Sequence, residues 1–415
     1  MKKVPIIIVI VLATVVLVCG IFALVNHFGE KGMNKYIDTF SPVLVEDPLT
    51  PVLEDGEYYF TTDRDFRVMQ LTDVHLGGGF LSRKKDKMAI NAIAAMVQEE
   101  QPDLIIVTGD TSFAVPYISG TINNAIAHRM FMRLMERLGV SWTVTFGNHD
   151  SESYNYYNRV AVSELYDDEA LEHCLFLPDG DLSGAGNHII NVKNSLGLIT
   201  ESFYMIDTHS YTDQDPLGIL WDYDYVKEDQ IAWYASKVDA HKASNAAIYE
   251  SLSEEQKAAY ADLLEPKSLM FMHIPLREVK YAYEESIANG KQDTENVKWL
   301  RGFDGETDEI VYSSRTDEQL FETVLEKGST KALFFGHDHL NNFVLEYKGI
   351  TLSYGYSIDY LAYSKINKRG YQRGCTVITC APNGDATIVH ENYYQDKYKP
   401  LYEKEIVDME QYKAE

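Results

Sequence analysis

The stretch Val140–Asp150, VSWTVTFGNHD, joins an apolar run to a group of polar side chains. Residues 140–146 predict a buried strand, because β-branched and aromatic residues dominate a short run that a glycine closes. Gly147 permits a sharp turn, and the polar residues after it would lie at the carboxyl edge of a sheet, where open α/β folds place their sites. An amide oxygen can ligate a metal, an imidazole can transfer a proton, and a carboxylate can orient that imidazole. Taken alone, the tetrapeptide is explained equally well by a capped turn.

Four other stretches have the same form, a short β-type run that ends in potential metal ligands. They are Thr72-Asp73-Val74-His75, Thr108-Gly109-Asp110, Met272-His273-Ile274-Pro275 and Gly336-His337-Asp338-His339. Carboxylates, imidazoles and an amide oxygen suit a binuclear metal site, and two cations about 3.5–4 Å apart can clamp a phosphoryl group. Each block alone is most often a turn or a hydrogen-bonded core histidine. Five blocks in this order leave that interpretation little room.

Strands and helices are predicted to alternate over residues 66–146. Strands are expected at 66–72, 104–107 and 140–146, with helices at 84–99 and 122–138 between them. This order implies right-handed crossovers and a mostly parallel sheet. Further strands are expected at 188–192, 202–206, 268–272, 331–335, 343–347, 350–354, 375–380 and 386–390, and helices at 153–166, 227–240 and 251–264. The strand-rich C-terminal part favours a second sheet packed on the first.

The composition excludes some partners. The chain has 415 residues, of which 45% are hydrophobic, enough for a large core in one or two domains. Its net charge of −26 repels nucleic acid and anionic lipid at long range, so no nucleic-acid partner is expected. A small anionic substrate stays compatible, because two bound cations reverse the potential locally. Four cysteines are too few for a disulfide framework, and buried or free thiols are the better interpretation.

Residues 4–25 form an apolar run long enough to span a bilayer. Lys2 and Lys3 precede it, which favours a cytoplasmic N-terminus for residues 1–3 and places the rest of the chain outside. A cleaved signal peptide is the alternative, although its apolar core is usually shorter. We therefore expect a single-pass protein of the cell membrane with an extracytoplasmic catalytic domain.

The remaining domain boundaries follow from composition. Residues 26–58 are polar and contain three prolines, which predicts a stalk or linker. Residues 59–397 are expected to form the catalytic domain, and residues 398–415 a charged, peripheral tail. The segments 153–187, 209–226 and 277–315 carry no readable motif, so the sequence does not predict the substrate.

The five blocks resemble the calcineurin-like metallophosphoesterase family, whose motifs run D-x-H, GD, GNH(D/E), H and GHxH. The match spans about residues 66–340, and it implies an α/β four-layer sandwich of two mixed β-sheets flanked by helices, here with an N-terminal transmembrane helix. Within the family, the chain looks most like purple-acid-phosphatase-like proteins of plants and fungi. That likeness rests on FGNHDSE at 146–152, DQIAWY at 229–234 and FGHDHLNNF at 335–343. Purple enzymes carry an iron-binding tyrosine where this chain has Phe113, so the resemblance implies a non-purple metal pair.

The family pattern, carried over by residue, implies two divalent ions of Mn, Fe or Zn. The first ion would be held by Asp73, His75, Asp110 and His339, and the second by Asp110, Asn148, His273 and His337. Asp110 would bridge them. His149 would protonate the leaving oxygen or stabilise its charge, with Asp150 holding its ring. For His209, a substrate contact and a structural hydrogen bond are both left open.

The resemblance implies hydrolysis of a small phosphomonoester by metal-bound hydroxide attacking in line. A phosphodiesterase or pyrophosphatase acting on nucleotide or lipid head groups is the alternative among enzymes. A surface-anchored binding protein with a degenerate site is the alternative from another class, and the complete ligand set counts against it. Neither the identity of the metals nor the oligomeric state follows from the sequence.

Overall fold

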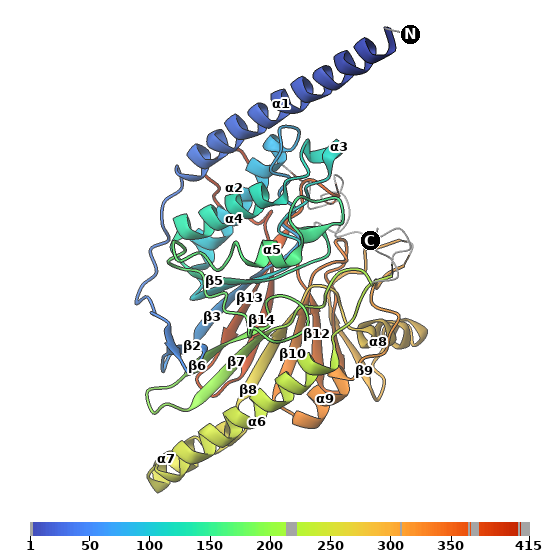
Figure 1. The fold of residues 1–415 in the computed structure, drawn as a ribbon. Coiled ribbons are helices and arrows are strands. Elements are labelled where there is room, and N and C mark those ends of the chain that lie inside the picture. The colour runs from blue at the N-terminus through green and yellow to red at the C-terminus, as the bar shows by residue number, and fades with distance from the viewer. Residues whose placement is uncertain are drawn as a thin grey trace.

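The computed structural model describes residues 3–212, 222–307, 309–363, 366, 373–405 and 407. Two mixed β-sheets pack face to face, and helices cover their outer faces (Figure 1). The predicted layered α/β fold is therefore confirmed.

The smaller sheet has the strand order β14-β13-β3-β4-β5. Its strands are β3 (Phe66–Leu71), β4 (Leu104–Thr108), β5 (Ser141–Thr145), β13 (Gly374–Cys380) and β14 (Ala386–Asn392). Strands β3, β4 and β5 are parallel, and β13 runs antiparallel to β3. Helices α2 (Arg83–Glu100) and α4 (Asn124–Leu138) follow β3 and β4 along the chain, as the sequence predicts for a βαβαβ unit.

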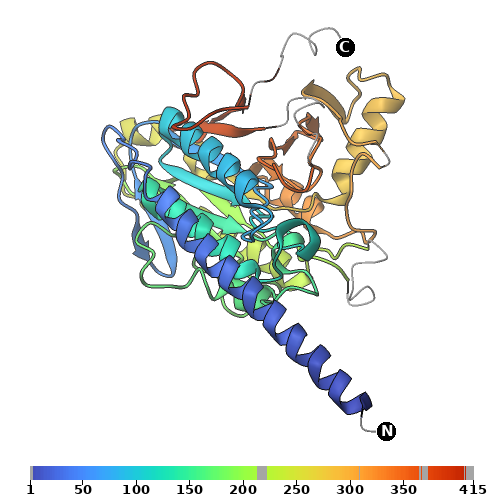
Figure 2. The ribbon, with the colours of Figure 1, turned by 90° about the horizontal axis from the view of Figure 1, so that it is seen from above.

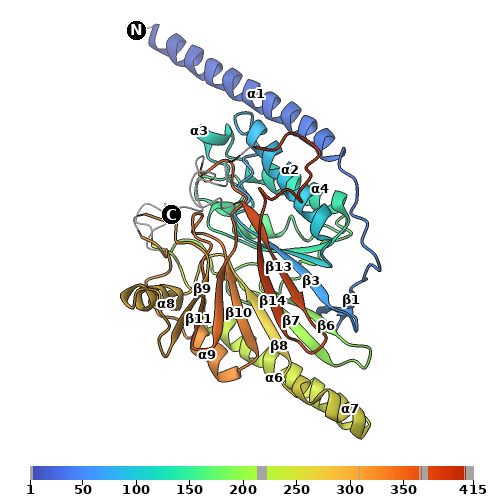
Figure 3. The ribbon, with the colours of Figure 1, turned by 180° about the vertical axis from the view of Figure 1, so that it is seen from behind.

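The larger sheet has the strand order β1-β2-β6-β7-β8-β10-β12-β11-β9, with β1 and β9 at opposite edges (Figure 3). Its strands are β1 (Val52–Glu54), β2 (Glu57–Thr61), β6 (His188–Lys193), β7 (Ile199–Met205), β8 (Lys267–Phe271), β9 (Val297–Arg301), β10 (Thr330–Phe335), β11 (Val344–Tyr347) and β12 (Ile350–Tyr354). The central strands β7, β8, β10 and β12 are parallel, whereas the outer pairs β1/β2, β6/β7, β11/β12 and β9/β11 are antiparallel.

The other helices are α3 (Pro116–Ser119), α5 (Arg159–Ser163), α6 (Glu228–Glu250), α7 (Glu254–Ala259), α8 (Arg277–Ala288) and α9 (Leu320–Lys327), with 3-10 turns at His149–Ser151 and Ala261–Leu264. The helix expected at 153–166 forms only as α5. The chain turns first, since the Asn155 amide donates to the Glu152 carbonyl, and the Asn158 side chain then caps the helix by accepting from the Ala161 amide.

Apolar side chains fill three spaces. The space between the sheets is filled from both sides, for example by Phe66 and Ile106 of the smaller sheet and Phe203 and Phe334 of the larger one. A second cluster joins the smaller sheet to α2 and α4, and a third joins the larger sheet to α6, α8 and α9. Burial of these faces fixes the two sheets relative to each other and so positions the loops at their carboxyl edges.

Helix α1 (Lys3–Ile37) runs well past the apolar segment and onto the domain (Figure 2). Met33 and Ile37, four residues apart and so on one helix face, are buried in the cluster with α2 and α4. The expected stalk at 26–58 is therefore not a separate linker: it contains the packed end of α1, and then β1 and the start of β2. The part of α1 that begins at Ile7 is long and apolar enough to cross a membrane, by length and composition.

The C-terminal segment also differs from the expected peripheral tail. Tyr398 is buried and its hydroxyl donates to Glu100, and the Tyr402 ring lies 4.6 Å from that of Tyr36 on α1. Glu405 accepts from the buried Arg373. Residues 398–405 thus pack on the domain, whereas residues 408–415 lie outside the described residues, as do residues 1 and 2 of the expected N-terminal segment.

Candidate metal centre

Every predicted ligand lies within four residues after the end of a strand, and the loops that follow these five strands come together. Asp73 and His75 follow β3, Asp110 follows β4, Asn148 follows β5, His273 follows β8, and His337 and His339 follow β10. Hydrogen bonds tie the loops together, since the Asp73 amide donates to the Gly109 carbonyl and the His337 amide donates to the Asp73 carboxylate at 3.1 Å.

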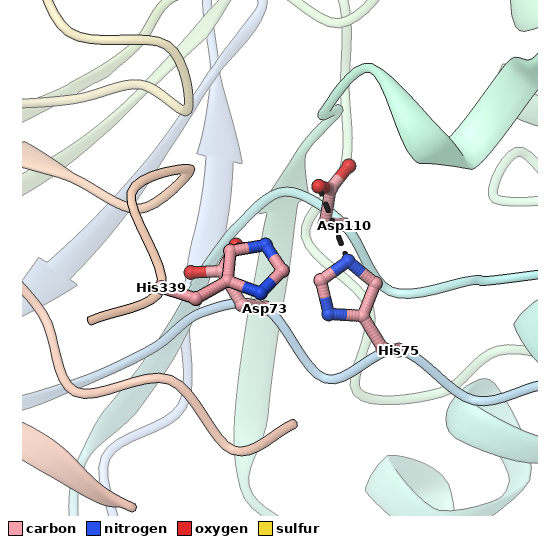
Figure 4. A group of neighbouring side chains, drawn as sticks. All are labelled: Asp73, His75, Asp110 and His339. Carbon is pink, nitrogen blue, oxygen red and sulfur yellow. Dashed lines mark ion pairs between the residues drawn. The ribbon is translucent and has the colours of Figure 1, made fainter. Parts of the chain in front are cut away.

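The first group consists of Asp73, His75, Asp110 and His339, and Figure 4 shows these side chains converging from three loops. Their potential ligand atoms all lie within 4.8 Å of one another. His75 Nε2 is 3.3 Å from Asp110 Oδ2, and His339 Nε2 is 3.4 Å from Asp73 Oδ1. Spacings of this size are those between ligands that share one cation.

The second group consists of Asp110, His273 and His337, by the same spacing. Asp110 Oδ2 lies 3.1 Å from His273 Nε2, so a single carboxylate oxygen faces one histidine of each group. The other oxygen, Oδ1, accepts from the His149 amide at 2.8 Å. That hydrogen bond fixes the orientation of the Asp110 carboxylate, with Oδ2 between His75 and His273.

Asn148 has the orientation of a ligand to the second group. Its Nδ2 donates to the Tyr211 hydroxyl at 3.2 Å, which leaves Oδ1 buried without a hydrogen-bond partner. His273 is set in the same way, because its Nδ1 donates to the Thr108 carbonyl at 2.8 Å and its buried Nε2, 3.1 Å from Asp110 Oδ2, has no hydrogen-bond partner.

Unpartnered polar atoms test whether these residues suit metal ions. Buried polar groups are nearly always hydrogen-bonded, so each exception needs an explanation. Five of the predicted ligands contribute buried atoms without a partner: His75 Nδ1 and Nε2, Asp110 Oδ2, Asn148 Oδ1, His273 Nε2 and His337 Nε2. Nitrogen and oxygen donors gathered in this way fit divalent cations of the Mn, Fe or Zn type.

The backbone is strained at four of the predicted ligands. Asp73, His75, Asp110 and His337 have φ angles of 50°, 49°, 52° and 74°. Non-glycine residues rarely adopt this left-handed region, and such strain gathers at functional sites. Strong tertiary constraints therefore hold four of the predicted ligands in these conformations.

Gly147, the glycine of the GNHD block, lies where a larger residue would collide with a neighbouring side chain. A Cβ on Gly147 would collide with the Asp110 carboxylate, and one on Gly336 would collide with the Thr72 hydroxyl. The sequence predicts that Gly147 permits a turn. The structure shows that it also permits the close approach of the Asp110 carboxylate.

The carboxylates of the site favour positive charge at two of its histidines, whereas burial and the neighbouring His273 lower the pKa of His337. Burial would lower the pKa of His273, but the adjacent Asp110 carboxylate outweighs burial and raises it to about 9. Burial is likewise outweighed at His339 by Asp73 and Asp359, and its pKa also rises to about 9. A field that stabilises a protonated imidazole stabilises a divalent cation for the same reason.

A family model for calcineurin-like phosphoesterases matches residues 66–341, about two thirds of the chain. The chain belongs to the calcineurin-like phosphoesterase family. Probable inactive purple acid phosphatase 28 of Arabidopsis thaliana is 25% identical over 74% of each chain. Phosphatase DCR2 of Saccharomyces cerevisiae is 23% identical over 69% of this chain and 46% of its own length. The predicted likeness to purple-acid-phosphatase-like proteins is confirmed.

Among solved structures, a dimetal phosphatase from Danio rerio is 11% identical to this calcineurin-like phosphoesterase. The match covers 80% of this chain and 97% of that one, with a TM-score of 0.48.

His149 of this phosphoesterase is oriented by a residue that the sequence analysis did not assign. Asp150 was expected to hold its ring. Instead, His149 Nδ1 lies 2.7 Å from Glu152 Oε1, because the 3-10 turn at His149–Ser151 brings residues three apart onto one face. Burial would lower the pKa of His149, but Asp110 and Glu152 raise it overall. The only feature of the sequence that indicates this contact is the separation of three residues between His149 and Glu152.

The Asp150 carboxylate instead accepts hydrogen bonds from backbone amides. It accepts from the amides of Gly147, Asp110 and Ser112 at 2.8, 3.0 and 2.9 Å. These bonds join the loop after β5 to the loop after β4. Asp150 therefore supports two ligand-bearing loops and does not contact the His149 ring through a hydrogen bond.

Asp359 is a further carboxylate that the sequence analysis missed. Its Oδ2 lies 3.2 Å from His339 Nδ1, and its Oδ1 lies 3.8 Å from His75 Nδ1. Burial would raise the pKa of Asp359, but these histidines lower it well below its usual range. It lies after β12, remote from every motif, so only the fold reveals that it orients the His339 ring and lies beside the His75 ring.

His209 is not oriented as a substrate contact. Its Nε2 lies 3.0 Å from Gln230 Oε1, and its carbonyl accepts from Arg159. Of the two alternatives, the structure favours the hydrogen-bonded structural histidine. Tyr211, two residues further on, reaches the site instead and contacts both Asn148 and Glu152.

A pocket of about 380 Å³ opens over the ligand groups. It is lined by Phe113, His149, Tyr223, Glu306, Tyr312, His337, Asp338, His339, Ala362 and Tyr363. Phe113, at the position of the tyrosine in purple enzymes, packs edge-on against His75 and His149 with ring centroids 5.2 and 5.0 Å apart. It offers no oxygen to a metal, which is consistent with the predicted non-purple site.

Proposed function

We propose that this chain is a binuclear metal-dependent hydrolase of phosphomonoesters. The observation that carries the proposal is the placement of Asp110, whose Oδ2 is 3.3 Å from His75 Nε2 and 3.1 Å from His273 Nε2. One carboxylate oxygen thus connects the two ligand groups. The proposed ligands are Asp73, His75, Asp110 and His339 for one ion, and Asp110, Asn148, His273 and His337 for the other.

Two divalent ions at these residues would lower the pKa of water and neutralise charge on the phosphoryl oxygens. The chain supplies the remaining chemistry. His149 lines the pocket, and Glu152 engages its Nδ1, so its Nε2 is left to pass a proton to the leaving oxygen. The raised pKa of His149 favours the protonated form that this role needs.

The word "inactive" in the name of the Arabidopsis relative belongs to that protein. In this chain, all seven proposed ligands are present, and five of them have buried atoms without a hydrogen-bond partner. A binding protein with a degenerate site would not need this arrangement, which supports an active enzyme.

We further propose that residues 4–25 anchor the enzyme in the cell membrane, with the catalytic domain outside. The anchor is supported by the most apolar stretch of α1, which has a mean hydropathy of 3.2 and of which no part is buried in the protein. Phe22 stacks on Phe80 with ring centroids 5.4 Å apart, which would hold the loop after β3 close to the bilayer. Alkaline carbonate extraction of full-length protein should leave it in the membrane. A soluble protein with an N-terminus matured near residue 26 would replace the anchor with a cleaved signal.

The enzymatic proposal is tested with the purified full chain in detergent, loaded with Mn²⁺, Fe²⁺ or Zn²⁺ in turn. We expect turnover of 4-nitrophenyl phosphate, and a lower kcat/KM for bis(4-nitrophenyl) phosphate. A preference for the diester would assign a phosphodiesterase. Absence of turnover of either ester, with metal bound, would contradict catalysis and support the binding-protein alternative.

A further inference from the structure

Two of the metal-ligand loops continue into the part of the domain that lies next to the apolar stretch of α1. The loop after β3 leads to α2, and the loop after β4 leads through α3 to α4. Both loops are joined to α1 near the point where it leaves the domain. The Phe22 ring stacks on the Phe80 ring, and the Asn26 side chain accepts from the Phe80 amide at 3.0 Å and donates to the Gly120 carbonyl at 3.2 Å.

Apolar side chains of these two loops are exposed beside α1. Leu81, Tyr117 and Ile122 have exposed fractions of 52%, 81% and 44%. The two loops adjoin each other, since the Leu81 amide donates at 3.0 Å to the carbonyl of Ser119, which lies between Tyr117 and Ile122 in the chain. Exposed apolar residues that gather in one place mark an interaction surface. We call Phe80, Leu81, Tyr117 and Ile122 the apolar loop face.

The apolar stretch of α1 continues past this face. In Figures 1 and 3, α3 lies beside the half of α1 that projects beyond the domain. No part of the most apolar stretch of that half is buried in the protein. Whatever surrounds this half of α1 therefore also adjoins the apolar loop face, and a lipid bilayer is the surrounding that suits both.

The loop after β3 is fixed in this position by a buried carboxylate. Asp86 of α2 accepts from the amides of Gly77 and Gly78 at 2.8 and 3.2 Å, and from the Ser82 hydroxyl at 2.7 Å. Because the loop is already ordered in the folded chain, its apolar side chains can meet a partner without a further ordering cost.

Basic residues border the apolar loop face, in contrast to the chain as a whole. The net charge is −26, yet Arg83, Lys84, Lys85 and Lys87 lie within five residues at the start of α2. Asp86, the acidic residue among them, is buried, whereas Lys84 and Lys87 are exposed. Basic side chains beside a membrane helix are attracted to anionic lipid head groups, and tyrosine is frequent at the depth of the head groups.

We propose that the apolar loop face docks on the lipid bilayer that α1 crosses, with its apolar side chains at the depth of the head groups and Lys84 beside anionic ones. This docking goes beyond the proposed hydrolysis and rests on the proposed membrane anchor. It brings the pocket close to the membrane, because Phe113 of the pocket belongs to the same apolar cluster as Ile118 of α3.

The docking is tested with the wild-type full chain in phosphatidylcholine vesicles that contain a photoreactive diazirine lipid. The diazirine lies within the acyl chain in one preparation and near the head group in another, and mass spectrometry locates the lipid adducts. We expect the acyl-chain probe to label the apolar stretch of α1, and the head-group probe to label Leu81 and Tyr117. The matched control is Leu53 of β1, which has the same exposed fraction of 52% as Leu81 but lies remote from α3 (Figure 3). Leu53 should carry no adduct.

A second arm tests the role of charge. Replacing about 30% of the phosphatidylcholine by phosphatidylglycerol should raise the adduct yield on Leu81 by about 2–5-fold, and Lys84→Gln should reduce this gain. Lys257→Gln is the control, because Lys257 lies on α7 at the opposite end of the molecule from α3 (Figure 1). This variant should keep the wild-type gain.

The outcomes separate the docking from the anchor and from catalysis. Acyl-chain adducts on α1, without head-group adducts on Leu81 and Tyr117 or with as many on Leu53, would overturn the docking and leave the anchor in place. Absence of adducts on both α1 and the apolar loop face would overturn both. An adduct yield on Leu81 that is independent of phosphatidylglycerol would overturn the role of Lys84. Turnover of 4-nitrophenyl phosphate tests the proposed hydrolysis independently of all of these.

Discussion

The metal-ligand groups and the pocket wall lie side by side but are built in different ways. The ligands all follow strand ends, and short hydrogen bonds such as that from the His149 amide to Asp110 fix them. The wall includes residues from segments that carry no motif, namely Tyr223, Glu306, Tyr312, Ala362 and Tyr363. We expect the first region to set the reaction and the second to select the substrate. Substitutions should therefore act differently in the two regions.

Asp110→Asn should have the largest effect. It weakens the contact shared by both ligand groups, so we expect loss of both ions and a fall in kcat of at least about 10⁴-fold, beyond the range of a single proton donor. Metal analysis and turnover of 4-nitrophenyl phosphate measure the two losses. A variant that keeps both ions and most of its activity would show that Asp110 is not shared.

His149→Ala should affect chemistry without affecting metal content. His149 lies between the two regions, since its amide supports Asp110 while its ring lines the pocket. We expect turnover to fall by about 10²–10⁴-fold, most for alkyl phosphates and least for nitrophenyl esters, which leave without a proton. An equal loss for good and poor leaving groups, with metals retained, would refute the proton-donor role.

Asp150→Asn should act through the backbone. An amide replaces a carboxylate that accepts from three buried N–H groups, so at least one is left poorly satisfied. We expect the free energy of unfolding to fall by about 1–3 kcal/mol, measured by urea denaturation. Asp168→Asn, an exposed aspartate that accepts one amide, is the control and should change stability by less than about 0.5 kcal/mol. Similar effects of the two substitutions would remove the proposed role of Asp150.

Glu318→Gln should leave turnover unchanged and should alter only the pH dependence of stability. Glu318 lies in the motif-free segment before α9, where burial and the negative charges of Glu278, Asp317 and Glu322 raise its pKa to about 8. The folded protein therefore keeps a proton that an unfolded glutamate loses near pH 4, and its stability falls as the pH rises from there through about 8.

Removing this group should remove that fall. Relative to wild type, Glu318→Gln should gain ~1–3 kcal/mol of unfolding free energy between pH 5 and pH 9. Glu326→Gln, at an exposed position on α9, is the control and should follow the wild-type curve. Parallel curves for wild type and Glu318→Gln would contradict the raised pKa. Turnover at fixed pH should be unchanged, since Glu318 does not line the pocket.

The same contrast explains what could be predicted from the sequence. Ligands such as Asp110 and His273 were assigned because a strand followed by a metal-binding side chain is a local pattern, and parallel strands bring their carboxyl ends together. The β3–α2–β4–α4–β5 unit was predicted for the same reason. The strand β9 and helix α8 lie in a segment without a clear period and were not assigned individually.

The errors have physical causes. Asp359 was missed because it contacts His339 only in the folded chain. Asp150 was assigned to the His149 ring in place of Glu152, because the sequence does not show the 3-10 turn that brings Glu152 to that ring. The expected stalk was assigned from its prolines, although Met33 and Ile37 already repeat with helical spacing and bury against the domain. Tyr312 and Glu306 carry no signal, because only the folded chain places them beside the histidines.

The central claim is that one carboxylate, Asp110, unites two metal sites in an active enzyme. The most direct measurement is the metal-to-protein ratio of the full chain, titrated with Mn²⁺ or Zn²⁺ while the hydrolysis of 4-nitrophenyl phosphate is followed. The account predicts that activity reaches its maximum near two ions per chain. Full activity at a ratio that stays near one would contradict it.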